Sequence, residues 1–449
     1  MASKKKGTKK TTPLAPVNRR AAGVDIGSTF HVVAVPQELD AEPVRSFRSF
    51  TTDLNALADW LGRLGVTTVA MESTGVYWIP LFEILQARGL DVVLVNARDA
   101  KNVPGRKTDI NDAQWIQQLH SYGLLRASFR PEGEIVALRA YLRHRERLLE
   151  YAAAHVQHMQ KALMQMNLQL HHVVADIAGV TGMKILRDIV AGETDPEVLA
   201  AYRDMRCKSS IETIRDSLTG NYRPEHVFTL KQALELYDFY QARLSDCDVE
   251  IERALHALPK RAAPGPARSR QRGKNEPQFE IRLVMNALLG VDLTEIHGLG
   301  PYSVLRIFAE CGSDMTRWPT AKHFTSWLTL APGNKISGGK VLSAKTRRSA
   351  NRATVLLRLA AVSVSRTATA LGAFFRRLAA RVGKAKAVTA TARKIATVLY
   401  NTMRHGKAYV DPGAMYYEER YRERALSNLR RRANAMGFAL VASAVEGAS

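Results

Sequence analysis

Four carboxylates stand where the surrounding sequence would place them at strand ends and on one helix face. Asp25 lies within an apolar, strand-like run, and Glu72 directly follows another. Asp109 and Asp112 are spaced i, i+3 and would share one face of a helix. A carboxylate among apolar strand residues costs free energy unless a cation compensates it. Together the four acids could hold two Mg²⁺ ions about 4 Å apart, which would bind a phosphodiester and activate its attacking and leaving oxygens.

Each acid also has an ordinary structural interpretation. The run Asp25–Ser28 alone resembles the phosphate-binding turn that opens actin-like ATPases and sugar kinases. Asp109 alone is typical of a helix N-cap, and Glu72 alone is explained by an ion pair with Arg98 or Lys101. Only their joint occurrence, in this order and in an α/β context, favours a metal site.

A serine stands in a glycine turn that basic residues surround. Ser337 precedes Gly338 and Gly339, and the nearby cations are Lys335, Lys340, Lys345, Arg347, Arg348 and Arg352. Cations near a hydroxyl lower the cost of its alkoxide and stabilise charge that builds on an attacked phosphate. Taken alone, however, the pattern is more typical of a flexible polar turn.

A second glycine-rich turn, at 294–303, has the pattern of a helix–hairpin–helix motif. Gly298 and Gly300 would let backbone N–H groups approach a phosphate, and the N-terminus of the following helix would attract the anion. Because glycine-rich turns between helices are common, the turn alone does not establish DNA contact.

The charge of the chain is large and uneven. The sequence has 65 Lys+Arg against 42 Asp+Glu, a net charge of +23. Residues 315–410 contain 19 Lys/Arg and no acid, whereas residues 21–130 contain 10 Lys/Arg and 12 Asp/Glu. A stretch without acids cannot balance its charge by ion pairs within itself, and a surface that needs only solubility mixes both signs. We therefore expect nucleic-acid binding that weakens steeply with salt.

Composition excludes several protein classes. With 449 residues, 46% of them apolar, the chain can form two or three domains with hydrophobic cores. Its 3 cysteines lack metal-binding spacing and are expected to be buried thiols in a reducing cytoplasm.

The basic N-terminus has no apolar segment behind it, so we expect no signal peptide. Arg358 and Arg366 interrupt the most apolar window, which argues against a membrane span. The His155/His158 spacing is more typical of a helix surface than of a metal site.

Hydrophobic periodicity indicates the elements that must position these residues. Four short strand-like runs alternate with two helical patterns and predict a three-layer mixed α/β domain; the strands are expected at 23–27, 31–35, 68–71 and 91–95, and the helices at 53–64 and 81–87. Apolar residues then step by three and four from Ile135 to Leu170, with Arg145 as the polar exception, and again from Leu230 to Leu258. These series predict an antiparallel coiled-coil hairpin, either a dimerisation arm or the core of a bundle within one chain.

Changes in composition divide the chain into six segments. We predict a basic disordered arm (1–20), an α/β domain (21–130), a helical coiled-coil region with an insert (131–258), a basic linker (259–278), a mainly helical domain with the serine (279–410) and a helical charged tail (411–449).

Three motifs in the first domain resemble those of the DEDD-type insertion-sequence transposases, also known as bridge-RNA-guided recombinases, with Piv-like DNA invertases as relatives. The motifs are Gly23–His31, Met71–Trp78 and Lys107–Ala113. Later motifs at 390–394 and 406–411 agree, so the resemblance covers nearly the whole chain. Only the basic arm and residues 175–225 match weakly.

The resemblance implies a RuvC-like variant of the RNase H fold and a mainly helical C-terminal transposase domain. It assigns the four acids of the family to Asp25, Glu72, Asp109 and Asp112, with Mg²⁺, or Mn²⁺ in its place, as cofactor. The Ser-Gly-Gly-Lys match makes Ser337 the nucleophile, with Ser343 and Ser349 as fallback candidates. Many relatives have a glycine where Ser349–Arg352 stands, which leaves the geometry of this loop open. The residues expected to contact nucleic acid are Gly298, Gly300, Lys335, Lys340, Lys345, Arg347, Arg348, Arg352, Arg393 and Lys394.

The function that the resemblance implies is site-specific recombination. A cytoplasmic, nucleoid-associated bacterial enzyme would cut and rejoin double-stranded DNA at element ends and target through a phosphoserine, guided by a noncoding RNA. It would act as a homodimer that assembles into a tetramer. No acid lies near Ser337 in the sequence, so its proton acceptor must come from elsewhere. This predicts a composite site with the acidic domain of the same chain or of a partner subunit.

Three other functions compete with this interpretation. A metal-dependent RuvC-type nuclease or Holliday-junction resolvase would use water instead of Ser337. An actin-like ATPase or sugar kinase would need a second phosphate loop and an adenosine motif, which the sequence lacks. A nonenzymatic nucleoid-binding protein would explain the charge but leave the four carboxylates without a role.

Overall fold

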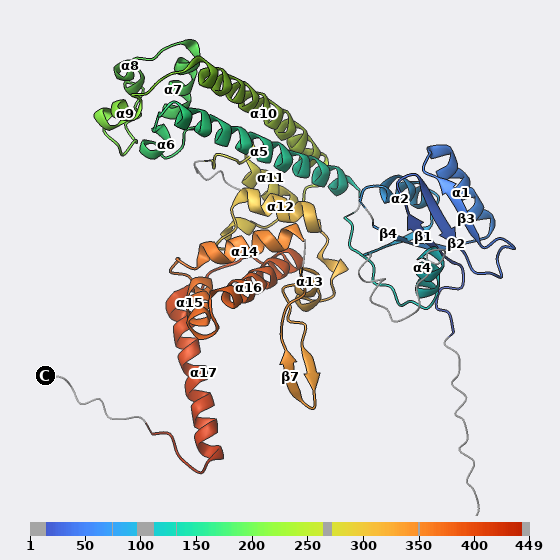
Figure 1. The fold of residues 1–449 in the computed structure, drawn as a ribbon. Coiled ribbons are helices and arrows are strands. Elements are labelled where there is room, and N and C mark those ends of the chain that lie inside the picture. The colour runs from blue at the N-terminus through green and yellow to red at the C-terminus, as the bar shows by residue number, and fades with distance from the viewer. Residues whose placement is uncertain are drawn as a thin grey trace, which may run out of the picture. The chain divides into compact units, whose positions relative to one another are not determined.

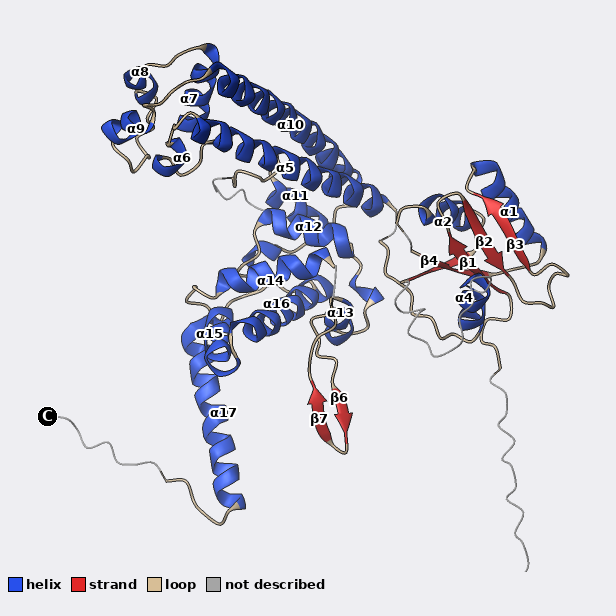
Figure 2. Cartoon of the chain, viewed as in Figure 1, coloured by secondary structure: helices blue, strands red, loops and turns tan. Residues whose placement is uncertain are grey.

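The chain forms two compact units, Met1–Arg130 and Pro131–Ser449, each with its own core (Figure 1). The computed structural model describes residues 15–73, 75–96, 112–131, 133–263, 272–348 and 351–441. Most strands belong to the first unit, and the second is mainly helical (Figure 2). The prediction of a mixed α/β region followed by helices is therefore confirmed. Among the described helices, none has the length and hydropathy needed to cross a membrane.

A five-stranded mixed sheet forms the centre of the first unit. Its strands are β1 (Ala21–Ile26), β2 (Phe30–Ala34), β3 (Val44–Arg48), β4 (Thr68–Glu72) and β5 (Asp91–Val95), in the order β3-β2-β1-β4-β5. The first three strands pair antiparallel, whereas β4 and β5 run parallel to β1. The four predicted strands are present, and β3 was missed because its sequence, VRSFR, has few apolar residues and is only partly buried.

Helices cover both faces of this sheet. On one face α1 (Thr51–Arg63) and α2 (Trp78–Ala87) bury a core against Val24, Met71 and their neighbours. Helix α1 follows its predicted period, since Leu54, Leu57, Trp60 and Leu61 are all buried. On the other face lies α4 (Asp112–Ser121), which packs directly on β1.

Two long antiparallel helices begin the second unit. Helices α5 (Glu134–Gln165) and α10 (Pro224–Ala257) pack along each other, as the two hydrophobic series predict. The first series continues to Leu170 in the sequence, but α5 ends at Gln165 because Asn167 adopts a left-handed backbone conformation. A small helical cap joins their far ends and shares one hydrophobic core with them. It contains α6 (Leu170–Val173), α7 (Val180–Ala191), α8 (Pro196–Ala200) and α9 (Ile211–Ser217).

Arg145, the polar exception in the hydrophobic series, is buried in an ion pair with Asp248 of α10. The side chains are 3% and 5% exposed, and Nε donates to Asp248 Oδ1 over 2.5 Å. Arg145 Nη1 also donates to the Asn275 carbonyl and to Tyr302 Oη. Gln278 N donates to Asp248 Oδ2. Burial lowers the pKa of the Arg145 guanidinium, but its bonds to Asp248 and Tyr302 outweigh this and raise that pKa.

The remaining chain is a set of packed helices from which one β-hairpin projects (Figure 1). Its elements are α11 (Ile281–Leu289), η2 (Leu293–Glu295), α12 (Pro301–Cys311), η3 (Met315–Arg317), α13 (Ala321–Trp327), β6 (Lys335–Ser337), β7 (Lys340–Ser343), α14 (Arg352–Val364), α15 (Ala370–Val382), α16 (Lys384–His405) and α17 (Gly413–Ala435). The hairpin was not anticipated in the mainly helical segment 279–410.

We predict that Arg145→Met lowers the free energy of unfolding of the second unit by about 3–5 kcal/mol. The reason is that Asp248 would keep a buried charge without its cation. Urea unfolding followed by far-UV circular dichroism measures the loss. The matched control is Arg147→Met, which breaks an exposed pair with Glu150 and should cost less than about 1 kcal/mol. Equal losses in both variants would contradict a special role for the buried pair.

Two buried histidines make the first unit sensitive to acid. His31 is 1% exposed and His120 is 6% exposed, and burial lowers the pKa of both imidazoles, partly offset at His120 by the charge of Asp91. Below the unfolded pKa of about 6.5 the unfolded chain therefore binds more protons than the folded one.

We predict that the free energy of unfolding of the first unit is highest above a pH of about 6.5 and falls as the pH drops below that value. The fall should be smaller in His31→Leu. Urea denaturation with pulse proteolysis, scored on peptides from 21–95, measures the slope. His144→Leu, at an exposed position in the second unit, should leave the slope unchanged. A slope that His31→Leu does not alter would refute the assignment.

Candidate active site

Asp25 and Glu72 lie side by side at one edge of the sheet. Strands β1 and β4 are parallel neighbours in a register that pairs Val24 with Met71, so the next pair along both strands is Asp25 and Glu72. Val24 and Met71 face the core beneath α1 and α2. Because side chains alternate along a strand, Asp25 and Glu72 point to the opposite face, where α4 lies. Both are partly exposed.

A glycine brings α4 onto this face. A Cβ atom on Gly23 would lie 2.2 Å from Gln117 N and 2.4 Å from the Ala113 carbonyl oxygen, so no other residue fits there. Further along α4, His120 Nε2 lies 2.8 Å from Thr68 Oγ1 of β4. Helix α4 thus runs antiparallel to β1, and its first residue lies toward the end of the strand that carries Asp25.

Asp112 is that first residue of α4, directly before Ala113. Gly23 and Asp25 lie on the same face of β1, two positions apart, or about 6.8 Å along the strand. The fold therefore directs Asp25, Glu72 and Asp112 to the same edge of the sheet, from two strand ends and a helix start. The fourth predicted acid, Asp109, lies outside the described residues.

These acids suit a hard divalent cation by their chemistry. Carboxylate oxygens are the ligands that Mg²⁺ prefers, and a carboxylate in the first turn of α4 is favoured by the helix dipole. Within the ranges that the structure describes, no three His, Cys, Asp or Glu side chains are grouped closely enough to hold a metal ion. The metal site thus stays a prediction.

Ser337 is the last residue of β6 and stands beside the turn of the β6–β7 hairpin. Gly338 and Gly339 form that turn with φ of 53° and 75°. Positive φ at both central residues is the requirement of a type I′ turn, which suits glycine and matches the twist of the strands. The two glycines thus form the turn of a β-hairpin, for which the sequence pattern predicted only a polar glycine turn. Two glycines between short strand-like runs were the signal available in the sequence.

The hairpin has two different faces. Ser337 pairs with Lys340, and Lys335 with Ser343, while Ile336 pairs with Val341. Paired residues share a face and neighbours along a strand alternate. The hydroxyl of Ser337 therefore shares its face with the amine of Lys340. Ile336 and Val341 occupy the other face and are 61% and 57% exposed.

The other predicted cations have different surroundings. Arg347 Nη2 donates to the Ser326 carbonyl and joins the base of the hairpin to α13, and Gly333 N donates to the carbonyl oxygen of Lys345. Lys345 and Arg348 are exposed. Arg393 and Lys394 lie on α16, with Lys394 Nζ 5.2 Å from the ring centroid of Phe374 in α15. Ser349, a fallback nucleophile, lies outside the described residues.

Of the two glycines named in the 294–303 turn, Gly298 is required by packing. Gly298 has a φ of 90°, and a Cβ atom there would lie 2.7 Å from the Ala360 carbonyl oxygen of α14. Gly300 precedes α12 with a φ of −84°, which any residue adopts. The requirement for glycine at 298 is thus explained by contact with α14, and phosphate binding at this turn stays a prediction.

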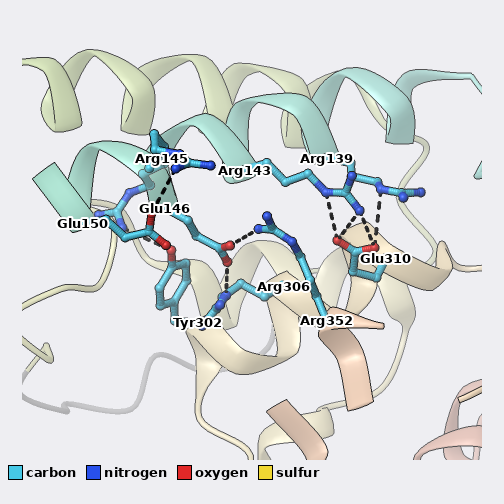
Figure 3. Close-up of polar contacts among 10 residues, drawn as sticks. Arg139, Arg143, Arg145, Glu146, Glu150, Tyr302, Arg306, Glu310 and Arg352 are labelled. Atoms are coloured by element: carbon cyan, nitrogen blue, oxygen red, sulfur yellow. Dashed lines mark hydrogen bonds and ion pairs between the residues drawn. The ribbon is translucent and has the colours of Figure 1, made fainter. Parts of the chain in front are cut away.

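Helix α5 supplies one acid, Glu146, to the acid-free stretch 315–410, which sequence reasoning did not foresee. Glu146 binds Arg306 of α12 and Arg352 at the start of α14 (Figure 3). In the reverse direction, Glu310 of α12 binds Arg139 and Arg143 of α5. Arg377 likewise pairs with Glu418, beyond the other end of the stretch. Acids on distant segments therefore neutralise some of its charge, and Arg352 is held by Glu146.

Two family models match two separate regions of the chain. Residues 22–168 match the transposase family of the DEDD type found in IS110 elements. Residues 292–376 match the transposase IS116/IS110/IS902 family. No curated protein matches the chain. The first match contains the acidic edge of the sheet and the second contains the β6–β7 hairpin. The chain belongs to the IS110 family of DEDD transposases.

Proposed function

We propose that this transposase cuts and rejoins double-stranded DNA through a covalent phosphoserine at Ser337. The observation that carries the proposal is the hairpin, which holds an exposed hydroxyl on the same face as Lys340. Around it, residues 315–410 contain 19 Lys/Arg and no acid. Such a segment attracts the phosphates of DNA at close range.

In the proposed step, Ser337 Oγ attacks a phosphorus atom of the DNA backbone. One O–P bond forms to the serine while one P–O bond to a deoxyribose breaks. The serine proton passes to a base, and the departing sugar oxygen gains a proton. Because one phosphodiester replaces another, rejoining needs no external energy source. Lys335 and Lys340 would stabilise the negative charge that grows on the phosphate.

The acids of the first unit would supply the metal ligands and the proton acceptor that residues 315–410, which contain no acid, cannot supply. We propose that Asp25, Glu72, Asp109 and Asp112 hold Mg²⁺, or Mn²⁺ in its place. Such an ion, when bound, stabilises charge on a phosphate. One of these carboxylates would accept the proton of Ser337, either within one chain or between two copies. The strand order β3-β2-β1-β4-β5 and the family support a RuvC-like fold for this unit.

The partners proposed for the enzyme follow from the same assignment. Element ends and target DNA are its substrates, and a noncoding RNA would guide their choice at the bacterial nucleoid. We propose a homodimer that assembles to a tetramer through the α5–α10 pair. The exposed side chains of Tyr151, Leu236 and Phe239 on these helices support a second copy there. The six segment boundaries given above are part of this proposal.

We predict that Ser337→Ala abolishes the protein–DNA adduct that survives denaturation, with DNA affinity changed less than about twofold. The substrate is a plasmid with both element ends, incubated with the adjacent noncoding transcript and Mg²⁺. Denaturing gel electrophoresis detects the adduct. The control Ser343→Ala removes the hydroxyl of the other serine in the hairpin, and this variant should still form the adduct. Cleavage that persists in Ser337→Ala would identify a nuclease that uses water.

We predict that Asp25→Asn and Asp112→Asn each slow cleavage by about 100-fold, with partial recovery at higher Mg²⁺ or Mn²⁺ concentration. Each change removes a charged oxygen ligand from the proposed site. Cleavage rates over a metal titration test this. Glu38→Gln removes an exposed acid of the same unit and serves as control. Unaltered rates and metal dependence in the two Asp variants would contradict the metal site.

A further inference from the structure

A groove between α15 and α17 has no role in the proposed cleavage step. Its volume is about 760 Å³, within the range of about 300–1,000 Å³ that is typical of ligand sites. Helix α15 contributes Phe374, Arg377 and Arg381 to its lining, and α17 contributes Tyr417, Tyr421 and Arg424.

Aromatic rings and cations alternate in this groove. Phe374 and Tyr417 meet edge to face, with ring centroids 6.1 Å apart. The Arg377 guanidinium lies 3.7 Å from the centroid of Tyr421, and Lys394 lies over Phe374. The three aromatic side chains are partly exposed. Flat rings next to guanidinium groups are the surfaces on which nucleobases stack.

The charge of the groove is not balanced by the described residues. Arg377 pairs with Glu418. Arg381 and Arg424 line the groove, and Lys394 of α16 lies beside it over Phe374. None of these three cations has a carboxylate partner among the residues that the structure describes. Burial, and next the charge of Arg424, lower the pKa of the Lys394 amine. The two cations therefore repel each other, and a bound anion would relieve that repulsion.

Helix α17 lacks the burial that normally holds a surface helix. It has 23 residues and no fully buried side chain. Most of the stability of a helix in a protein comes from packing of a buried face, so α17 gains little from its own packing. Helix α17 packs on α15 around this groove, so that a ligand in the groove would contact both helices and add to their contact.

We propose that the α15–α17 groove binds an unpaired nucleotide segment, with phosphates on Arg381, Arg424 and Lys394 and a base against Tyr417 or Tyr421. A duplex hides the faces of its bases, so only a single strand can use these rings. This inference rests on the proposed function, since the enzyme must act with nucleic acid. The segment could come from the guide RNA or from a strand of opened DNA, because both present the same phosphates and base faces.

The test measures binding of the full chain to labelled oligo(U) and oligo(dT) octamers and to a short duplex, by fluorescence anisotropy. Arg381→Ala/Arg424→Ala removes charge, and Tyr417→Leu/Tyr421→Leu removes stacking while keeping apolar packing. The matched control, Arg430→Ala/Arg432→Ala, removes two exposed charges of α17 that do not line the groove.

We expect the arginine variant to weaken octamer binding about tenfold beyond the control. The tyrosine variant should weaken it about fivefold with duplex binding unchanged. Loss with oligo(U) only would identify RNA as the source, loss with oligo(dT) only would identify DNA, and equal loss would mean that the groove binds the shared features. The proposal is overturned if the arginine variant equals the control, or if duplex binding falls in proportion.

Octamer binding does not depend on cleavage. Ser337→Ala should therefore bind both octamers as the unaltered chain does, whatever happens to the DNA adduct. If the unaltered chain forms no DNA adduct but the groove variants lose octamer binding, the recombinase proposal is refuted and the groove assignment stands. If the unaltered chain forms the adduct but the groove variants bind octamers as the control does, the groove assignment is refuted and the recombinase proposal stands.

Discussion

The ion pair of Arg145 and Asp248 constrains most of the second unit. A buried guanidinium is tolerated only when its donors have partners, and here the partners come from three places in the chain. Asp248 belongs to α10, Tyr302 to α12, and the Asn275 carbonyl to the segment before α11. The charge therefore fixes the register of α5 on α10 and joins both to the domain that carries the hairpin.

The candidate carboxylates and the candidate serine lie in regions that differ in architecture. The acids stand at strand ends and a helix start, where Gly23 lets α4 approach the sheet. The serine stands on a hairpin that projects its side chains into solvent. A sheet edge would fix the spacing of the carboxylates that we propose as metal ligands. An exposed hairpin would suit the proposed nucleophile, because Ser337 is accessible among the residues that the structure describes.

Local patterns predicted the elements well, and long-range pairing explains what they missed. Alternation and helical period located β1, β2, β4, β5 and the two long helices, since each buries one face of a regular element. The hairpin was missed because its apolar side chains, such as Ile336, are exposed and leave no burial pattern. The pairing of Glu146 with Arg352 joins positions 206 residues apart, which no local pattern contains. The common location of Asp25, Glu72 and Asp112 could be anticipated from strand ends, but the contact of α4 at Gly23 that produces it could not.

The length of α5 separates its ion pairs with α12 and α14 from the α6–α9 cap. With 32 residues the helix is about 48 Å long, and Glu146, which holds Arg306 and Arg352, lies near its middle. About 28 Å of helix extends beyond that point to the α6–α9 cap. The ion pairs of Glu146 thus hold α5 to α12 and α14 well before the cap begins. The cap lies beyond that part of α5, and its core is shared with the ends of α5 and α10.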